Sequence, residues 1–235
     1  IAGLTLIYKG MASSQDYVLA MDNSNSMMVD DFKPSRFVVA KETAKDFIES
    51  LGPDNYVAVL SFSSVSQVET PLSNDQLHVK QVINDISLSD VGGTDLGQAI
   101  VNGANLLLQS DKGKAMILLS DGQGNIGIPI DEAVDYANIR GVTIYTIGMG
   151  TKEGGDFFGV PLVIDEETMS YIAVNTGGKY YRVENEEELR KTYNEIANIN
   201  ERKISNNLSL TFIILALLLL LYEWILINTK YRTLP

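Results

Sequence analysis

Residues 17–26 read YVLAMDNSNS, an apolar run that ends in an aspartate followed by serines at alternating positions. The short, unbroken apolar run over 17–21 predicts a buried β-strand. Successive side chains of an extended chain point to opposite sides, so Asp22, Ser24 and Ser26 are expected to face one common point. The stretch therefore predicts either a polar loop or an oxygen-lined site at the end of a strand.

Strand and helix patterns alternate along the rest of the chain. Runs that predict strands lie at 56–62, 67–70, 115–119, 142–147 and 179–183, and helical spacing occurs at 36–51, 74–86, 95–109, 131–140, 165–176 and from 185 onward. In the 74–86 helix the pattern directs Leu77, Val79 and Ile83 inward. Buried strands separated by helices predict an α/β fold with a doubly wound, mostly parallel, Rossmann-like sheet that is covered on both faces.

Composition excludes several classes of function. The 235-residue chain contains no cysteine, which excludes disulfides and thiolate metal sites. Its net charge of −12 argues against nucleic acid as a partner. His78 is the only histidine and is expected on the surface of a helix, so histidine-based acid–base catalysis is not predicted.

The two ends of the chain differ from its centre. We assign 14–199 to the α/β domain, 200–207 to a polar stalk and 229–235 to a basic tail. Residues 208–228 are almost wholly apolar, and about 20 helical residues cross a ~30 Å hydrocarbon core, so they predict a single C-terminal transmembrane helix in contact with membrane lipid. Residues 1–13 begin with an apolar segment that is either the end of a membrane segment or an edge strand. Lys230 and Arg232 in the tail favour a tail on the inside and an acidic domain on the outside.

Two further loops place oxygen-bearing side chains near the ends of predicted strands. They are the loop over 92–95, which contains Thr94, and the loop over 120–122, which contains Asp121. Ligands of open α/β sheets bind at the carboxyl ends of the strands, so both side chains are expected beside Asp22, Ser24 and Ser26. Such an all-oxygen set suits a hard cation, Mg²⁺ first, with Mn²⁺ or Ca²⁺ as alternatives. Two carboxylates balance a divalent charge, and an acidic residue of a partner protein can complete the coordination.

These residues resemble the metal-ion-dependent adhesion site of von Willebrand factor A (VWA) domains. In that family the residues that match Asp22, Ser24 and Ser26 bind the cation directly, and those that match Thr94 and Asp121 bind it directly or through water. The resemblance implies a protein-interaction module over about 14–199. Many members have glycine where this chain has Asn25, and we expect asparagine to preserve the loop because it tolerates unusual backbone angles.

A narrower resemblance is to Bat-type membrane-anchored VWA proteins. It rests on the segments DFKPSR at 31–36, DEET at 165–168 and TGGKYY at 176–181, and on a domain followed directly by an apolar helix. The resemblance implies a cytoplasmic-membrane protein with its VWA domain on the outer face. It also implies a MoxR-type AAA+ ATPase and other VWA membrane proteins as partners, in the assembly or maturation of envelope proteins.

Three functions are weighed against one another. The first is a protein-binding module with a Mg²⁺-dependent adhesion site. The second is a structural subunit or adhesin whose cation site is non-functional or only structural. The third, a metal-dependent phosphohydrolase, is not expected because Asp22 is followed two residues later by Ser24 rather than by a second acid. Asp30 and Asp31 are interpreted as solvated loop charges or as charges at a helix N-terminus, with a second cation site as the alternative. Residues 150–160 are predicted to be a loop.

Overall fold

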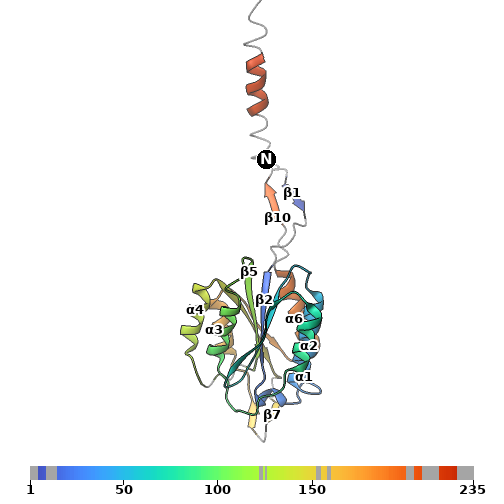
Figure 1. The fold of residues 1–235 in the computed structure, drawn as a ribbon, viewed down its shortest axis with the longest axis vertical. Coiled ribbons are helices and arrows are strands. Elements are labelled where there is room, and N and C mark those ends of the chain that lie inside the picture. Colours follow the sequence, from blue (N-terminus) through green and yellow to red (C-terminus); the bar gives the residue numbers. More distant parts are fainter. Residues whose placement is uncertain are drawn as a thin grey trace, which may run out of the picture. The chain divides into compact units, whose positions relative to one another are not determined.

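Six strands form the central sheet, five of them parallel (Figure 1). The computed structural model describes residues 5–8, 15–121, 124, 126–151, 155–157, 160–199, 204–207 and 217–226. In spatial order the strands are β4 (Ser66–Ser73), β3 (Val57–Phe62), β2 (Gln15–Asp22), β5 (Gly113–Ser120), β6 (Val142–Met149) and β9 (Tyr180–Val183). Only β4, at one edge, runs antiparallel to its neighbour. The prediction of a mostly parallel α/β sheet is confirmed.

Helices cover both faces of the sheet (Figure 1). One face packs against α1 (Arg36–Ser50), α2 (Gln76–Asp85) and α6 (Glu186–Ile199), and the other against α3 (Leu96–Leu106), α4 (Ile130–Ile139) and α5 (Glu166–Asn175). Each face has its own buried apolar cluster, and alternate residues of one strand feed the two clusters. This is the doubly wound arrangement predicted from the buried strands.

The central strand shows why its sequence is apolar throughout. Tyr17, Leu19 and Met21 enter the α1 side of the core, whereas Val18 and Ala20 enter the α3 side. On the α1 side, the ring of Phe47 meets that of Tyr17 edge-on with centroids 5.4 Å apart. Because both faces of β2 are buried, a polar residue is tolerated only where the strand ends, and Asp22 occupies that position.

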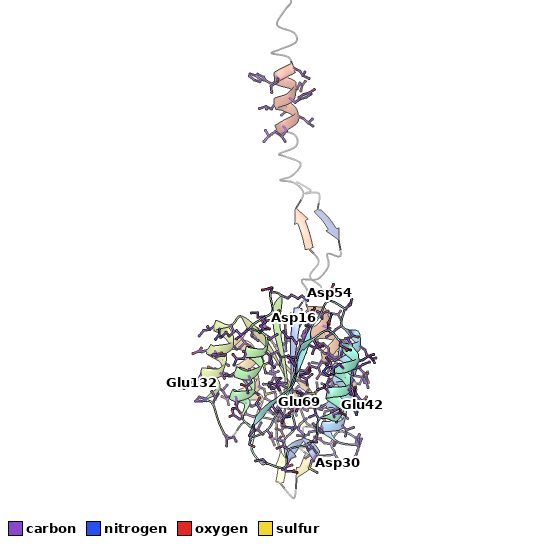
Figure 2. All side chains as sticks on the ribbon, viewed as in Figure 1. Asp16, Asp30, Glu42, Asp54, Glu69 and Glu132 are labelled. Carbon is purple, nitrogen blue, oxygen red and sulfur yellow. The ribbon has the colours of Figure 1, made fainter. Side chains whose placement is uncertain are left out.

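The parallel register brings several polar loops to one end of the sheet. β2 pairs with β3 up to Asp22 opposite Phe62, and with β5 up to Met21 opposite Leu119. Ser120 and Asp121 therefore follow β5 at the level where Asp22 ends β2. Figure 2 shows the two ends of the domain, with Asp16 of β2 at one end and Asp30, shortly after β2, at the other.

Three features of the domain differ from the predictions. Strand β4 continues through Pro71 to Ser73, because an edge strand tolerates a proline that lacks a donor. The segment predicted to be a loop over 150–160 contains β7 (Gly155–Phe157), which pairs antiparallel with β8 (Val160–Leu162). Leu77 is 76% exposed, so its predicted inward orientation is wrong, whereas Val79 and Ile83 are buried as predicted.

Residues 13–200 make up one compact unit, and 1–12 with 201–235 form a separate one. In the second unit, β1 (Thr5–Tyr8) pairs antiparallel with β10 (Ile204–Asn207), so 5–8 form a strand and the predicted stalk contains another. Residues 217–226 are helical. The remainder of the predicted 208–228 span lies outside the described residues. Within the described part of the chain, no helix has both the length and the apolar character needed to cross a membrane.

Candidate functional site

Asp22 is the centre of the candidate site. Its carboxylate is completely buried and accepts two hydrogen bonds. The backbone N–H of Ser24 donates to Oδ1 at 2.8 Å, and the hydroxyl of Ser120 donates to Oδ2 at 2.5 Å. These bonds fix the side chain at the junction of β2 and β5.

The serines after Asp22 lie together as predicted, although a 3₁₀ helix rather than an extended loop brings them there. Ser24 precedes the short 3₁₀ helix η1 (Asn25–Met28), and its Oγ lies 2.9 Å from Oγ of Ser26. Ser24 is buried and Ser26 is partly exposed. Asn25 is the first residue of η1, so the loop forms with asparagine where many VWA domains have glycine.

Thr94 lies on a neighbouring loop at the same end of the sheet. It is buried just before α3, and the backbone N–H of Asp95 donates to the carbonyl of Ser63, directly after β3, at 2.7 Å. The Asp95 carboxylate caps α3 by accepting from the N–H of Gln98 at 2.7 Å and also accepts from the N–H of Ile128 at 3.3 Å. Asp95 thus joins the Thr94 loop to the segment that follows Asp121.

Asp121 approaches the site from β5. Its side chain is 1% exposed, and its backbone carbonyl accepts from the N–H of Asp165 at the start of α5. Because β2 pairs with β5 up to Met21 opposite Leu119, Asp22 and Asp121 follow at the ends of adjacent strands, and the charge of Asp121 helps to raise the pKa of Asp22. The structure therefore brings the two predicted acids together from two adjacent strands.

Burial and mutual repulsion govern the protonation of Asp22. Burial of its carboxylate, followed by the charge of Asp121, raises the pKa of Asp22 to about 7, and the hydrogen bonds from Ser120 and Ser24 oppose the rise. A buried carboxylate pair of this kind favours binding either a proton or a cation. The donor set of two carboxylates and nearby hydroxyls fits a hard divalent cation. Within the described part of the chain, no cluster of three or more His, Cys, Asp and Glu side chains is arranged to hold a metal, so any cation here would depend on this mixed set.

Arg36 is the site residue that the sequence analysis missed. It is the first residue of α1, its side chain is fully buried, and Nη1 lies 3.6 Å from Oδ2 of Asp121. Nε and Nη2 donate to the two carboxylate oxygens of Asp31 at 2.8 and 2.6 Å. Burial favours protonation of Asp31, but the hydrogen bonds and charge of Arg36 dominate and hold the pKa of Asp31 below its usual range. The signal in the sequence was an acid five residues before an arginine at a helix start, which has no periodic pattern.

The other residues singled out in the sequence lie apart from this cluster. Asp30 is exposed and pairs with Lys33 at 2.6 Å. Because Asp31 is engaged by Arg36, Asp30 and Asp31 do not form a second acidic pair open to a cation, and Asp31 is not a solvated charge either. His78 is exposed on α2 and contacts Thr70 at 3.4 Å.

The fold and the arrangement of these loops define the class of protein. The chain belongs to the von Willebrand factor type A domain family, whose model matches residues 16–195. It is similar to a UPF0353 protein of Nocardia farcinica, with 28% identity over 83% of this chain and 66% of the relative. It is also similar to a UPF0353 protein of Mycobacterium tuberculosis, with 27% identity over 92% of this chain and 70% of the relative. The chain thus spans about two thirds of the length of the curated relatives it matches.

Solved structures share the fold. An aerotolerance-related membrane protein from Bacteroides fragilis has a TM-score of 0.71 and 24% identity, over 79% of this chain and 100% of that one. BatB from Bacteroides thetaiotaomicron has a TM-score of 0.70 and 24% identity, over 80% of this chain and 100% of that one. Proximal thread matrix protein 1 from the mussel byssus has a TM-score of 0.66 and 20% identity, over 86% of this chain and 50% of that one. It was solved with zinc in its adhesion-site motif. These likenesses establish a common fold.

Proposed function

We propose that this chain is a protein-binding module that recognises an acidic side chain of its partner through a divalent cation. The observation that carries the proposal is the convergence of Asp22 and Asp121 in one buried, oxygen-rich cluster with Ser24 and Ser26. Asp22, Ser24, Ser26, Thr94 and Asp121 would hold the cation. A bound cation would supply a positive centre for an oxygen of the partner.

The protein itself supplies the conditions for such recognition. Ser120 and the Ser24 backbone orient Asp22, and Asp95 fixes the loop that carries Thr94. Hard oxygen ligands favour Mg²⁺, with Mn²⁺ or Ca²⁺ as alternatives. The zinc-bound mussel protein supports the general suitability of the fold for a divalent ion at this position. We propose that the chain is not an enzyme, because Asp22 is followed two residues later by Ser24 rather than by the second acid that a phosphohydrolase needs.

The proposal extends to the setting of the domain. Membrane anchoring through 208–228 is supported by the apolar sequence and by a related fold in a protein named as a membrane protein. We place the domain on the outer face of the cytoplasmic membrane and its role in the assembly or maturation of envelope proteins. The first partner proposed is a protein that presents an acidic residue to the cation. A MoxR-type AAA+ ATPase and other VWA membrane proteins are proposed from the Bat-type resemblance.

One observation favours the alternative of a structural subunit or adhesin with a non-functional cation site. The guanidinium of Arg36, 3.6 Å from Asp121, already places a positive charge beside one of the two carboxylates. A cation that binds there must overcome repulsion from Arg36. The two functions therefore differ in whether the site binds a divalent cation at all.

Calorimetric titration of the chain with Mg²⁺ and Mn²⁺ separates the two. Saturable binding is expected for the parent, with loss in Asp22→Ala and Asp121→Ala. Ser110→Ala is the matched control because it removes a buried hydroxyl that donates to Asp16, at the opposite end of β2. Circular dichroism checks that every variant is folded. Binding that survives both aspartate substitutions, or no binding by a folded parent, would overturn the cation-dependent function.

A further inference from the structure

A polar pocket of about 300 Å³ lies beside the candidate cation site. It is bounded by β3, β4 and the segment that follows α2, and Asn23, between Asp22 and Ser24, forms part of its wall. Ligand pockets for cofactors and drug-sized molecules begin at about this volume, so the space suits a single long side chain better than a cofactor.

Hydroxyl groups and carboxylates line the pocket. Ser61, Ser63 and Ser87 contribute to the wall, with Glu69 and Asp85 as its charged residues. Glu69 is partly buried on the edge strand β4, and its Oε1 accepts from the hydroxyl of Ser61 at 2.6 Å. Within the described residues, no Lys, Arg or His side chain pairs with Glu69 or lines the pocket. The pocket therefore presents uncompensated negative charge at Glu69.

The end of α2 also has negative character, which Lys41 engages. Asp85 is its last residue, and the C-terminal carbonyls of a helix carry partial negative charge. Lys41 shows that an ammonium group binds well at this helix end, because its Nζ donates to the carbonyls of Asn84 and Ile86 at 2.6 and 2.8 Å. Lys41 also interacts with Asp85, so Glu69 is the main anchor left for a further cation.

The pocket is joined to the cation-site loop by hydrogen bonds. The Asn23 carbonyl accepts from the N–H of Ser89 at 2.8 Å, and its side-chain amide donates to the carbonyl of Ser87 at 3.0 Å. Asn23 is flanked by two candidate cation ligands, Asp22 and Ser24, so the pocket and the candidate cation site share one loop.

We infer that this pocket binds the lysine or arginine side chain of an extended partner segment that presents its acidic side chain to the neighbouring cation site. The acidic half of this motif rests on the proposed function. The basic half rests on Glu69 and the polar pocket around it, and it is testable without any metal.

The absence of cysteine from the chain allows a direct test. Ser87→Cys places one thiol on the exposed rim of the pocket, and Gln109→Cys places one on an exposed site next to Asp111, outside it. Each full-length variant is equilibrated in EDTA at physiological salt with the disulfides of cysteamine and mercaptoethanol. Intact-mass spectrometry then gives the ratio of the cationic to the neutral adduct.

The ratio of the cationic to the neutral adduct is expected to be about fivefold higher in Ser87→Cys than in Gln109→Cys, which corresponds to roughly 1 kcal/mol. Adding Glu69→Gln, which retains an acceptor for Ser61, should remove this preference. Glu132→Gln, on α4 (Figure 2), is the matched charge control and should leave this preference unchanged. Equal ratios in the two thiol variants, or a preference insensitive to Glu69→Gln, would overturn the inference. Because no metal is present, failure of cation binding leaves this result unchanged.

Discussion

Nη1 of Arg36 lies 3.6 Å from Oδ2 of Asp121, and both side chains are almost completely buried. The same guanidinium forms a two-bond ion pair with Asp31. The candidate cation site is therefore built against a permanent positive charge. Arg36 offsets the charge of Asp121 when no cation is bound and opposes a cation that enters.

Replacing Arg36 tests both parts of this relationship. Arg36→Met leaves Asp31 and Asp121 buried without the guanidinium, and breaking a buried pair from one side costs about 3–5 kcal/mol of unfolding free energy. Mg²⁺ should stabilise the variant more than the parent, because the positive charge that repels it is gone. Urea unfolding with and without Mg²⁺ measures both effects.

Lys33→Met is the matched control for Arg36→Met. It removes a cation from the exposed pair with Asp30, so no measurable change in stability is expected. Equal losses in the two variants, or an unchanged Mg²⁺ response in Arg36→Met, would show that Arg36 does not govern the charge of the site.

The raised pKa of Asp22 predicts that the metal-free protein loses stability against unfolding as the pH rises. A carboxyl group with a higher pKa in the folded state binds its proton more tightly there, so it contributes stability below its unfolded pKa of about 4, and this contribution is lost as pH rises through about 7. Asp22→Asn stays neutral and retains groups that can pair with Ser24 and Ser120. In EDTA it should be more stable than the parent at pH 8, on the order of a few kcal/mol, and nearly equal at pH 4.

Urea unfolding of Asp22→Asn and the parent between these pH values provides the measurement. Carboxylates that do not interact with Asp22 cancel in the difference. A difference that stays constant with pH would mean that ionisation of Asp22 does not destabilise the folded protein.

Ser120 is expected to tune cation affinity without binding the cation itself. Its hydrogen bond lowers the pKa of Asp22, so Ser120→Ala should raise that pKa further and weaken Mg²⁺ binding several-fold near neutral pH. The affinity should recover as the pH is raised, which calorimetry at two pH values detects.

The pair between Ser110 and Asp16 gives a control of the same chemistry. The Ser110 hydroxyl donates to Oδ2 of buried Asp16 at 2.7 Å. Ser110→Ala should reduce stability, but it should leave Mg²⁺ affinity and its pH dependence unchanged. A comparable loss of affinity in both variants would point to general loosening of the fold.

Gly127 is expected to be essential to the Thr94 loop. Its φ is +91°, and a Cβ at this position would overlap the carboxylate of Asp95, which caps α3. Gly127→Ala should therefore destabilise the domain and weaken Mg²⁺ binding. Gly141→Ala is the control, because Gly141 also has a positive φ of 68° but has open space around it, so only backbone strain of roughly 1–2 kcal/mol is expected. Similar losses of stability in the two variants, measured by thermal unfolding, would contradict the role of Asp95.

The sheet and the place of the site were predictable because buried parallel strands have a distinctive sequence. The apolar runs of β2 and β5 end at Asp22 and Ser120, and the edge at which parallel strands end is common to all of them. The pairing of Arg36 with Asp31 was not predictable in the same way. Charged residues near the start of a helix usually face solvent. Here the segment after β6 helps to enclose the pair, and the backbone N–H of Thr151 donates to Oδ2 of Asp31 at 3.2 Å.

Two smaller differences have similar causes. Leu77 follows the helix cap Asp75, and α2 covers only the edge of the sheet, so its buried stripe is limited to Val79 and Ile83. The β7–β8 hairpin consists of three-residue strands, which are too short for alternation to be recognised.

The direction of β2 has a mechanical consequence. Asp16, near the start of β2, and Asp30, shortly after the strand, lie at opposite ends of the domain (Figure 2), so β2 runs from one end towards the other and finishes at Asp22. Tension between a molecule held at Asp22 and the chain before Gln15 would run along β2. Because β2 is hydrogen-bonded on both sides to parallel strands, that load would shear many ladder bonds together instead of peeling them apart one at a time.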